Sequence, residues 1–145
     1  MKIRPAILIL ENDKILTMQY RYGNEDVFNI PGGNVEIGES LTETLEREMQ
    51  EELGIKVEVG NLILVGEVHF LEKNQQTLHC IFQGKILEGI PKLNPAETSA
   101  KSIKWLSINE LHSKNMYPNV GEAIQKWFSE KLENLYLGKI EQKYF

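Results

Sequence analysis

The chain has 145 residues, of which 41% are hydrophobic and 26% are charged, so it holds enough apolar material for one buried core and is not a disordered chain. Its formal net charge is −5, which argues against a nonspecific nucleic-acid-binding protein and against long-range attraction of a polyanion. We therefore expect one domain over residues 1–145 with no stable nucleic-acid partner, in which a phosphate ligand would need a bound cation or a local Arg or Lys.

The single cysteine and the short apolar runs bear on the compartment. Cys80 has no partner for an internal disulfide and lies in an apolar run, so we interpret it as a small buried side chain. The apolar run over residues 6–10 ends at Glu11, far short of the ~20 residues that a membrane-spanning helix needs. No cleavable signal is recognisable, and we expect a cytoplasmic protein without membrane contact.

In chain order, the N-terminal part of the sequence predicts extended segments that lead to a sharp bend. Residues 3–10 are rich in Ile and Leu, as in a buried strand, and residues 14–21 alternate in part, as in a second strand. Residues 11–13 are expected to form the turn between them. Residues 27–30 predict a short extended piece, after which residues 31–34, Pro-Gly-Gly-Asn, must bend.

A helix is expected to begin after Ser40. Ser40 and Glu43 have the spacing of a capping box, in which each side chain bonds the backbone of the other residue. Apolar residues then recur every four positions and form one stripe along the helix. They are Leu41, Leu45, Met49 and Leu53. Gly54 suits the left-handed residue that closes a helix.

The remainder of the chain predicts further strands and a second helix. In order, the expected elements are an extended segment over 55–71, a turn at 73–76, a strand at 77–87, a polar loop at 89–101, a strand at 103–106 and a helical turn at 108–112. Gly60 and Gly66 are candidate break points of the first of these. The last segment opens with Asn119 and Glu122, again at capping-box spacing, and its apolar positions as far as Leu135 fit a helix packed on the sheet. We therefore predict an α/β (α+β) fold, a mixed sheet with helices on its faces.

Three glutamates on the first helix form an unusual cluster. At ~100° per residue, Glu48 and Glu52 are neighbours one turn apart at the edge of the apolar stripe, and Glu51 lies further round. Two carboxylates about 4 Å apart repel by up to roughly 4 kcal/mol at an effective dielectric of about 20. The ordinary alternative is a solvated helix face with charge pairs, but no Lys occurs between positions 40 and 55 and Arg47 is the only cation there. A hard divalent cation would remove the repulsion.

The glycines before this helix also need comparison with a phosphate-binding P-loop. Gly33, Gly38 and Ser40 match the glycines and the hydroxyl of the motif G-x-x-x-x-G-K-[ST]. Glu39, however, occupies the lysine position of that motif, so an anion replaces the cation that binds phosphate. We therefore reject a P-loop.

The whole stretch of residues 33–55 resembles the Nudix box, G-x5-E-x7-R-E-U-x-E-E-x-G-U, where U is an aliphatic residue, and every fixed position is matched. The matching residues are Gly33, Glu39, Arg47, Glu48, Met49, Glu51, Glu52, Gly54 and Ile55. On this motif the chain is similar to the Nudix (MutT-like) hydrolases. Residues 105–111 resemble, less specifically, the strand and turn that follow the substrate site in many members.

The resemblance implies a fold, a cofactor and a set of roles. The fold would be a Nudix-type mixed β-sheet sandwiched between helices, and the cofactor would be Mg²⁺ or Mn²⁺. The implied metal ligands and catalytic residues are Glu48, Glu51 and Glu52. Gly33 would give the loop its tight bend, and Arg47 would orient the loop and the acidic helix through a salt bridge with Glu39.

The expected reaction is metal-assisted attack of water at phosphorus. The general base is left open between a box glutamate and a carboxylate from another loop, for which Glu97 is the candidate and also a further candidate metal ligand; the alternative for Glu97 is an ordinary exposed glutamate. The candidate substrate-binding residues are Arg4, Arg21 and Gly33, and the alternative for Arg4 is a surface arginine.

Aromatic and histidine side chains outside the box give weaker signals. Tyr20, Tyr22 and Phe70 are candidates for stacking on a base, with a place in the core or at its rim as the alternative. His69 and His79 are interpreted as structural histidines on a pair of strands.

The leading hypothesis is a pyrophosphatase that cuts a nucleoside diphosphate linked to another moiety, X, and releases a nucleoside monophosphate and a phosphorylated product. A non-catalytic Nudix-fold nucleotide sensor is the alternative. Such modules typically lose box carboxylates, and this chain keeps all of them. The substrate beyond a nucleotide-like small molecule, the number of metal ions and the presence of a homodimer are left open by the sequence.

Overall fold

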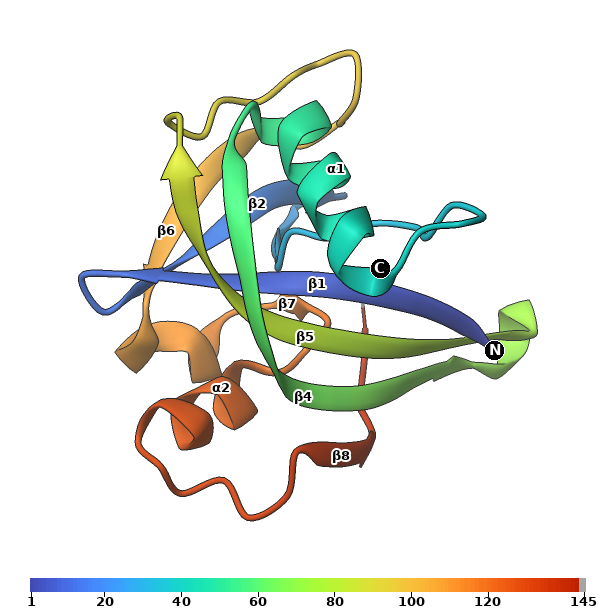
Figure 1. Ribbon diagram of the computed structural model, residues 1–145. Coiled ribbons are helices and arrows are strands. Elements are labelled where there is room, and N and C mark those ends of the chain that lie inside the picture. The colour runs from blue at the N-terminus through green and yellow to red at the C-terminus, as the bar shows by residue number, and fades with distance from the viewer. Residues whose placement is uncertain (144–145) are drawn as a thin grey trace.

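An eight-stranded mixed sheet carries the fold in this computed structural model, which describes residues 1–143 (Figure 1). The strands are β1 (Lys2–Glu11), β2 (Lys14–Tyr22), β3 (Glu25–Asn29), β4 (Lys56–Phe70), β5 (Gln75–Glu88), β6 (Ser102–Ser107), β7 (Met116–Tyr117) and β8 (Tyr136–Lys139). Their order is β7-β3-β2-β1-β5-β4-β8, and β6 pairs with β2 beside this path. The mixed sheet predicted from the sequence is confirmed.

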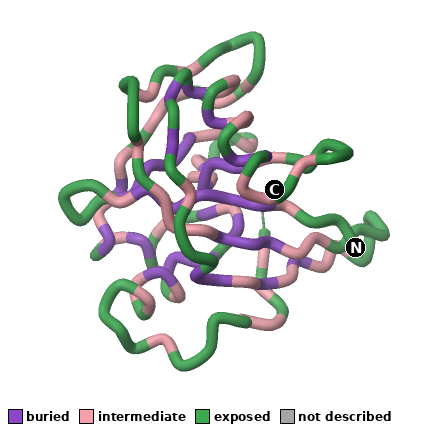
Figure 2. The backbone as a smooth tube through the Cα atoms, in the orientation of Figure 1, coloured by how far each residue is buried: buried purple, intermediate pink, exposed green. Residues whose placement is uncertain are grey.

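Helices cover both sides of the sheet. They are α1 (Leu41–Leu53) and α2 (Gly121–Phe128), with the short 3-10 helices η1 (Leu71–Lys73) and η2 (Ile108–Ser113). Alternate residues of β1 point to opposite faces of the sheet and pack into different hydrophobic clusters. Ile7 and Ile9 pack with the apolar stripe of α1, whereas Ala6 and Leu8 pack with the apolar residues of α2. Figure 2 shows this buried middle of the molecule between exposed loops, and the predicted sandwich is confirmed.

Helix α1 begins and ends where the sequence predicts. Ser40 and Glu43 form both hydrogen bonds of the capping box, and Gly54 closes the helix with a left-handed φ of 64°. Three residues of the predicted apolar stripe are fully buried. They are Leu45, Met49 and Leu53. Because the stripe is fixed against the sheet, the glutamates beside it are fixed in direction as well.

Strand β1 has different neighbours along its length. Its last residues pair with β2, whereas residues 2–9 run parallel to β5. On the side that β2 leaves open, Ala6 forms an isolated bridge with Gly32. This bridge holds the segment that leads into the glutamate motif against β1.

Strand β4 passes through both glycines at which the sequence analysis placed candidate break points. Its pairing with β5 shifts register between Val59 and Leu64, so an irregularity does follow Gly60. The pairing with β5 continues without a shift through Gly66, whereas the pairing with β8 shifts register between Val65 and Glu67. Because β4 is one continuous strand, the breaks expected at both glycines are wrong. A β-carbon on Gly66 would overlap the side chain of Ile140, so this glycine makes room for the segment after β8.

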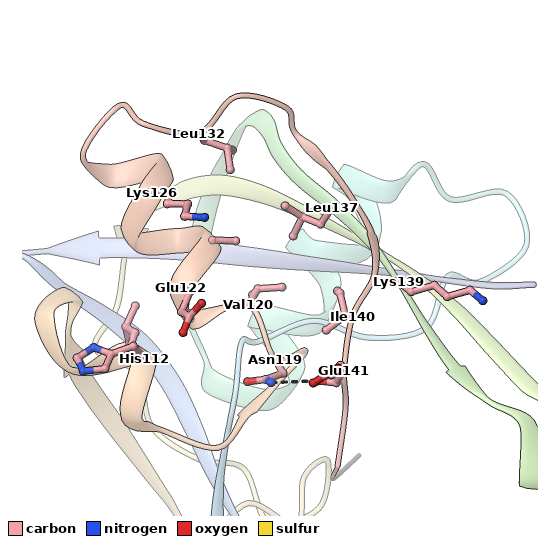
Figure 3. A pocket seen from close by; sticks show the side chains of 13 residues that line it. His112, Asn119, Val120, Glu122, Lys126, Leu132, Leu137, Lys139, Ile140 and Glu141 are labelled. Atoms are coloured by element: carbon pink, nitrogen blue, oxygen red, sulfur yellow. Dashed lines mark hydrogen bonds between the residues drawn. The ribbon is translucent and has the colours of Figure 1, made fainter.

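The second helix is shorter than the sequence predicted. It ends at Phe128, and Glu130 then adopts a left-handed backbone with a φ of 60°, which turns the chain before Leu135. Asn119 does not cap this helix, because its side-chain amide donates to the carbonyl of Glu141 at 3.0 Å (Figure 3). The chain then runs back beside β4 as β8, which the sequence analysis did not predict; β7 was not predicted either.

Two predictions from the sequence concern the single residues Cys80 and His69. Cys80 is a buried free thiol, as interpreted from its apolar surroundings in the sequence. His69 contacts Glu67 and Gln76 on its own strand pair, consistent with a structural histidine. No helix within residues 1–143 has the length and apolar character to cross a membrane.

Candidate active site

The loop that leads into α1 lies directly on β1. The N–H of Ile7 donates to the carbonyl of Pro31 at 2.8 Å, and the N–H of Gly33 donates to the carbonyl of Pro5 at 3.3 Å. A β-carbon on Gly32 would overlap that Pro5 carbonyl. The loop can follow β1 this closely only because position 32 has no side chain.

Gly33 is needed for a reason that differs from the expected one. The resemblance implied that Gly33 provides a tight bend, but its φ lies outside the left-handed range that favours glycine. Instead, a β-carbon on Gly33 would overlap the carboxyl group of Glu48. The absence of a side chain at position 33 therefore makes room for Glu48, which is brought from α1 to the backbone of the loop.

The salt bridge between Arg47 and Glu39 is present, as the resemblance implied. Nε of Arg47 donates to one Glu39 carboxylate oxygen at 2.7 Å and Nη2 donates to the other at 3.1 Å. Nη2 also donates to the carbonyl of Asn34 at 3.0 Å, and the Thr44 hydroxyl donates to Glu39. The guanidinium, followed by a backbone N–H from Glu36, lowers the pKa of Glu39 to about 2. This network ties the loop to the middle of α1.

Arg47 also holds two of the three predicted metal ligands, which the sequence analysis did not anticipate. Its Nη1 donates to Glu48 at 3.0 Å and to Glu51 at 3.1 Å. The Glu48 side chain is 15% exposed, whereas that of Glu51 is 40% exposed. Two carboxylates thus share one donor, which leaves most of their negative charge uncompensated.

Glu52 is the most strongly perturbed of the three glutamates. Burial, followed by the charge of Glu48 and then those of Glu51 and Glu97, raises its pKa to about 7, while the charge of Arg4 acts in the opposite direction. Burial also raises the pKa of Glu48, against the effect of the Arg47 guanidinium. Such raised values mark a site where negative charge is concentrated out of water.

The donor set fits a hard divalent cation by its chemistry. Carboxylate oxygens are what Mg²⁺ and Mn²⁺ prefer, and a cation would offset the neighbouring negative charge that, after burial, raises the Glu52 pKa. Across residues 1–143, no three Asp, Glu, His or Cys side chains already converge in a geometry that could hold a metal ion. Since Arg47 Nη1 binds Glu48 and Glu51, these two carboxylates would have to exchange that donor for the cation.

Arg4 is not the surface arginine that the sequence left as an alternative. Its guanidinium lies over the ring of Tyr117, 5.0 Å from the ring centroid, and Nη2 donates to the carbonyl of Ile30 at 3.3 Å. Nη1 is buried and has no hydrogen-bond partner. The charges of Glu52 and Glu48 both act on this guanidinium. Arg4 therefore offers a free donor within electrostatic reach of the two partly buried glutamates.

The other candidate arginine has a partner of its own. Nη1 of Arg21 lies 3.8 Å from the carboxylate of Asp26, on the hairpin between β2 and β3, and the Arg21 side chain is 53% exposed. No ion pair within residues 1–143 joins Arg21 to the box glutamates. Substrate binding by Arg21 stays a prediction without support from this geometry.

The loop over residues 89–101 closes the C-terminal end of α1. The backbone N–H of Asn94 donates to the carbonyl of Glu52 at 2.9 Å, and its side-chain amide donates to the carbonyl of Glu51 at 3.2 Å. The hydroxyl groups of Tyr20 and Thr98 share a hydrogen bond of 2.8 Å that ties the same loop to β2. Glu97, between these two anchors, is thereby brought within electrostatic reach of Glu52.

An aromatic and a histidine that sequence reasoning did not assign to the site lie behind Arg4. His79 is fully buried, both its ring nitrogens lack a hydrogen-bond partner, and burial followed by the charge of Arg4 lowers its pKa to about 3. Its ring meets that of Tyr117 edge-on, with 5.1 Å between centroids. Tyr117 also lines a cavity of about 540 Å³, together with Lys2 and Phe70.

Comparison with known proteins decides the family. The family model of the NUDIX domain matches residues 1–127 of this chain. The chain belongs to the NUDIX family. A mouse protein named nucleoside diphosphate-linked moiety X motif 6 is 33% identical over 64 residues, which are 44% of this chain but only 20% of that protein's length.

Solved structures, one of them of a NUDIX hydrolase, share the fold. A NUDIX hydrolase from Nitrosomonas europaea is 26% identical, with a TM-score of 0.73 and coverage of 92% of this chain and 93% of that one. The solution structure of the E. coli ORF135 protein is 22% identical, with a TM-score of 0.73 and coverage of 92% and 96%. The predicted family and fold class are confirmed, and the similarities support the prediction of a pyrophosphohydrolase.

Proposed function

We propose that this NUDIX protein is a metal-dependent enzyme that hydrolyses a diphosphate bond in a nucleoside diphosphate linked to another moiety, X. The products would be a nucleoside monophosphate and a second phosphorylated compound. One observation carries the proposal: the partly buried Glu48 and Glu52 lie within electrostatic reach of Arg4, whose buried Nη1 has no protein partner. Concentrated negative charge next to a free cationic donor suits a complex of metal and phosphate better than it suits either charge alone.

Glu48, Glu51 and Glu52 are the residues that would hold Mg²⁺ or Mn²⁺, with Glu97 as a further candidate. When bound, the cation would neutralise charge that builds on phosphate oxygens and would make a nearby water more acidic. The neighbouring protein groups would then fix the geometry. Arg47 and Glu39 keep the loop and α1 in register through their paired hydrogen bonds.

Arg4 would bind a phosphate oxygen through Nη1. An N–H···O⁻ bond of this kind is about twice as strong as a neutral one, and here it would satisfy a buried donor. The acceptor of the water proton would be a carboxylate with a pKa near neutrality, a condition that Glu52 meets before metal binds. Glu97 is the alternative acceptor, because its loop is anchored to the end of α1.

The rest of the ligand would extend past Tyr117 into the cavity of about 540 Å³. The name of the mouse relative, which refers to a nucleoside diphosphate linked to a moiety X, supports this class of substrate. A single domain over residues 1–145, a cytoplasmic location and the absence of a nucleic-acid partner belong to the same proposal. A homodimer is not required, because every group invoked comes from one chain.

A substrate panel tests the proposal. Purified protein is incubated with nucleoside triphosphates, nucleotide sugars and dinucleoside polyphosphates, each with Mg²⁺, with Mn²⁺ and with a chelator, and the products are resolved by anion-exchange chromatography. We expect metal-dependent release of a nucleoside monophosphate from at least one compound. Binding of a nucleotide with no product in any arm would instead establish the non-catalytic sensor.

A further inference from the structure

Arg4 has few contacts that determine where its free nitrogen points. Nη2 makes one hydrogen bond of 3.3 Å to Ile30, near the long end of the usual range, and Nη1 makes none. A flexible side chain with one long bond would sample several directions. The remaining contact of the guanidinium is the face of the Tyr117 ring, at 5.0 Å from its centroid.

The Tyr117 ring is itself firmly placed. The backbone carbonyl of Tyr117 accepts the N–H of Ile30 at 2.9 Å. Strand β7, which carries the ring, is therefore joined to the same residue whose carbonyl accepts from Arg4. The side chain of Gln142 bonds the backbone before and after Tyr117. It accepts from the N–H of Asn119 at 2.7 Å and donates to the carbonyl of Met116 at 2.9 Å. Gln142 thus fixes the backbone of residues 116–119, which includes Tyr117.

His79 supports the ring from the sheet. It lies directly opposite Arg4 in the parallel pairing of β1 and β5, and opposite Gly66 in the pairing of β5 and β4. Its ring meets Tyr117 at an interplanar angle of 90°. Because neither ring nitrogen has a hydrogen-bond partner, His79 acts here through the shape of its ring.

We propose that Tyr117, supported by His79, is a positioning residue that holds the Arg4 guanidinium so that Nη1 meets a phosphate oxygen beside Glu52. The inference rests on the proposed function, because it assigns the role of Tyr117 through the phosphate-binding role of Arg4. A cation over an aromatic face is held more strongly where the cation is removed from water, and Arg4 Nη1 is buried. Tyr117 would thus act on the diphosphate without touching it.

Two other roles for Tyr117 must be separated from this one. The ring lines the cavity, so it could contact the body of the ligand directly, or it could contribute only to stability. A probe consisting of phosphates alone removes the first possibility, since it has no part that reaches the cavity. A double-mutant cycle with Arg4 removes the second, because a general loss of stability does not depend on Arg4.

The experiment measures binding of methylenediphosphonate, a diphosphate analogue that cannot be hydrolysed, by calorimetry in the presence of Mg²⁺. The variants are Tyr117→Leu, Tyr117→Phe, Arg4→Met and the double variant Tyr117→Leu with Arg4→Met. We expect Tyr117→Leu to weaken binding about tenfold and Tyr117→Phe, which keeps the ring face, to weaken it less than about twofold. In the Arg4→Met background, Tyr117→Leu should have no further effect.

The inference is overturned if Tyr117→Leu weakens binding equally in both backgrounds, or if it leaves binding unchanged in the parent. Phe128→Leu, an exposed aromatic on α2, is the matched control and should bind as the parent does. If Tyr117→Leu does not fold, the same cycle is measured with His79→Ala in its place. His79→Phe, which keeps a ring at this position, is then the variant expected to bind as the parent does. A loss of about fivefold that vanishes without Arg4 supports the inference, and equal loss in both backgrounds overturns it.

The outcomes also separate the inference from the proposed function. If the parent binds methylenediphosphonate and releases nucleoside monophosphate in the substrate panel, a cycle without coupling overturns the role of Tyr117 alone. If the parent neither binds the probe nor hydrolyses any compound, both the proposed function and the inference fail.

Discussion

The backbone of Gly33 and the carboxyl group of Glu48 are so close that a β-carbon at position 33 would overlap the carboxyl carbon. This contact joins the first residue of the box to the first of the three glutamates proposed as metal ligands, across 15 positions of sequence. It explains why the motif needs glycine there although the backbone conformation does not. The motif therefore encodes a contact between a loop and a helix in addition to a set of ligands.

Gly33→Ala should displace Glu48 from the loop and lower turnover about a hundredfold, because misplacement of a catalytic group by about 1 Å has an effect of that size. The fold should survive, since the Arg47–Glu39 bridge is left intact. Steady-state kinetics on the substrate found in the panel measure the change. Asn34→Ala is the control, because only the backbone carbonyl of Asn34 binds Arg47. Turnover of Gly33→Ala equal to that of the control would contradict the role of this contact.

Glu52→Gln should lower turnover with Mg²⁺ at least about a hundredfold, because a neutral amide neither neutralises the cation nor accepts a proton. Glu46→Gln on the exposed side of the same helix is the matched control and should be as active as the parent. Circular dichroism of both variants verifies that α1 is intact. An active Glu52→Gln protein would rule out Glu52 as a ligand or as the base.

The same substitution should raise stability when metal is removed. Glu52 titrates near 7 in the folded state but near 4.5 when unfolded, so the folded state binds more protons between these values. Stability is therefore highest below pH 4.5 with respect to this group and is lost as pH rises through 7. In EDTA at pH 8, Glu52→Gln should be more stable than the parent by about 1–2 kcal/mol, after allowance for partial exposure to solvent. Urea unfolding of both proteins at pH 5 and pH 8 measures this, and a stability difference between variant and parent that does not grow from pH 5 to pH 8 would contradict it.

His79 should have the opposite dependence on pH. Its pKa is lowered to about 3 in the folded state, from 6.5, so the unfolded state binds more protons between these values. Its contribution is complete above pH 6.5 and is lost as pH falls toward 3. Between pH 7 and pH 5 the parent should lose about 2 kcal/mol that His79→Phe does not lose. Chemical unfolding of both proteins at the two pH values gives this difference, and parallel curves would show that His79 is not buried in neutral form.

Much of this site can be read from the sequence, because the box concentrates local signals. The capping box at Ser40, the left-handed Gly54 and the apolar stripe fix the direction of α1 from neighbouring residues alone. The placement of Glu48 and Glu52 at the edge of that stripe follows from helical periodicity. Burial raises the pKa of both carboxyl groups, and the neighbouring carboxylates, whose repulsion the sequence predicts, raise it as well.

The parts that could not be predicted depend on contacts between distant segments. Tyr117 reaches Arg4 from a strand more than a hundred positions away, and that strand of two residues has no periodicity to detect. Asn94 bonds the end of α1 from a loop that reads only as polar. The helix expected to reach Leu135 ended early because Glu130 turns the chain, although glutamate is a good helix former. In each case tertiary contacts outweigh local preference.

Substitution of Glu97 tests whether the loop after β5 takes part in catalysis. Asn94 bonds two carbonyls at the end of α1 and so fixes the backbone of this loop, and the charge of the exposed Glu97 acts on Glu52. If Glu97 is the general base, Glu97→Gln should lower turnover by about a hundredfold and leave binding of methylenediphosphonate unchanged. If Glu97 acts only through its charge on Glu52, turnover should fall less than about tenfold and its dependence on pH should shift. Glu88→Gln, at the exposed end of β5, is the control, and activity of Glu97→Gln equal to that of the control at every pH would remove Glu97 from the site.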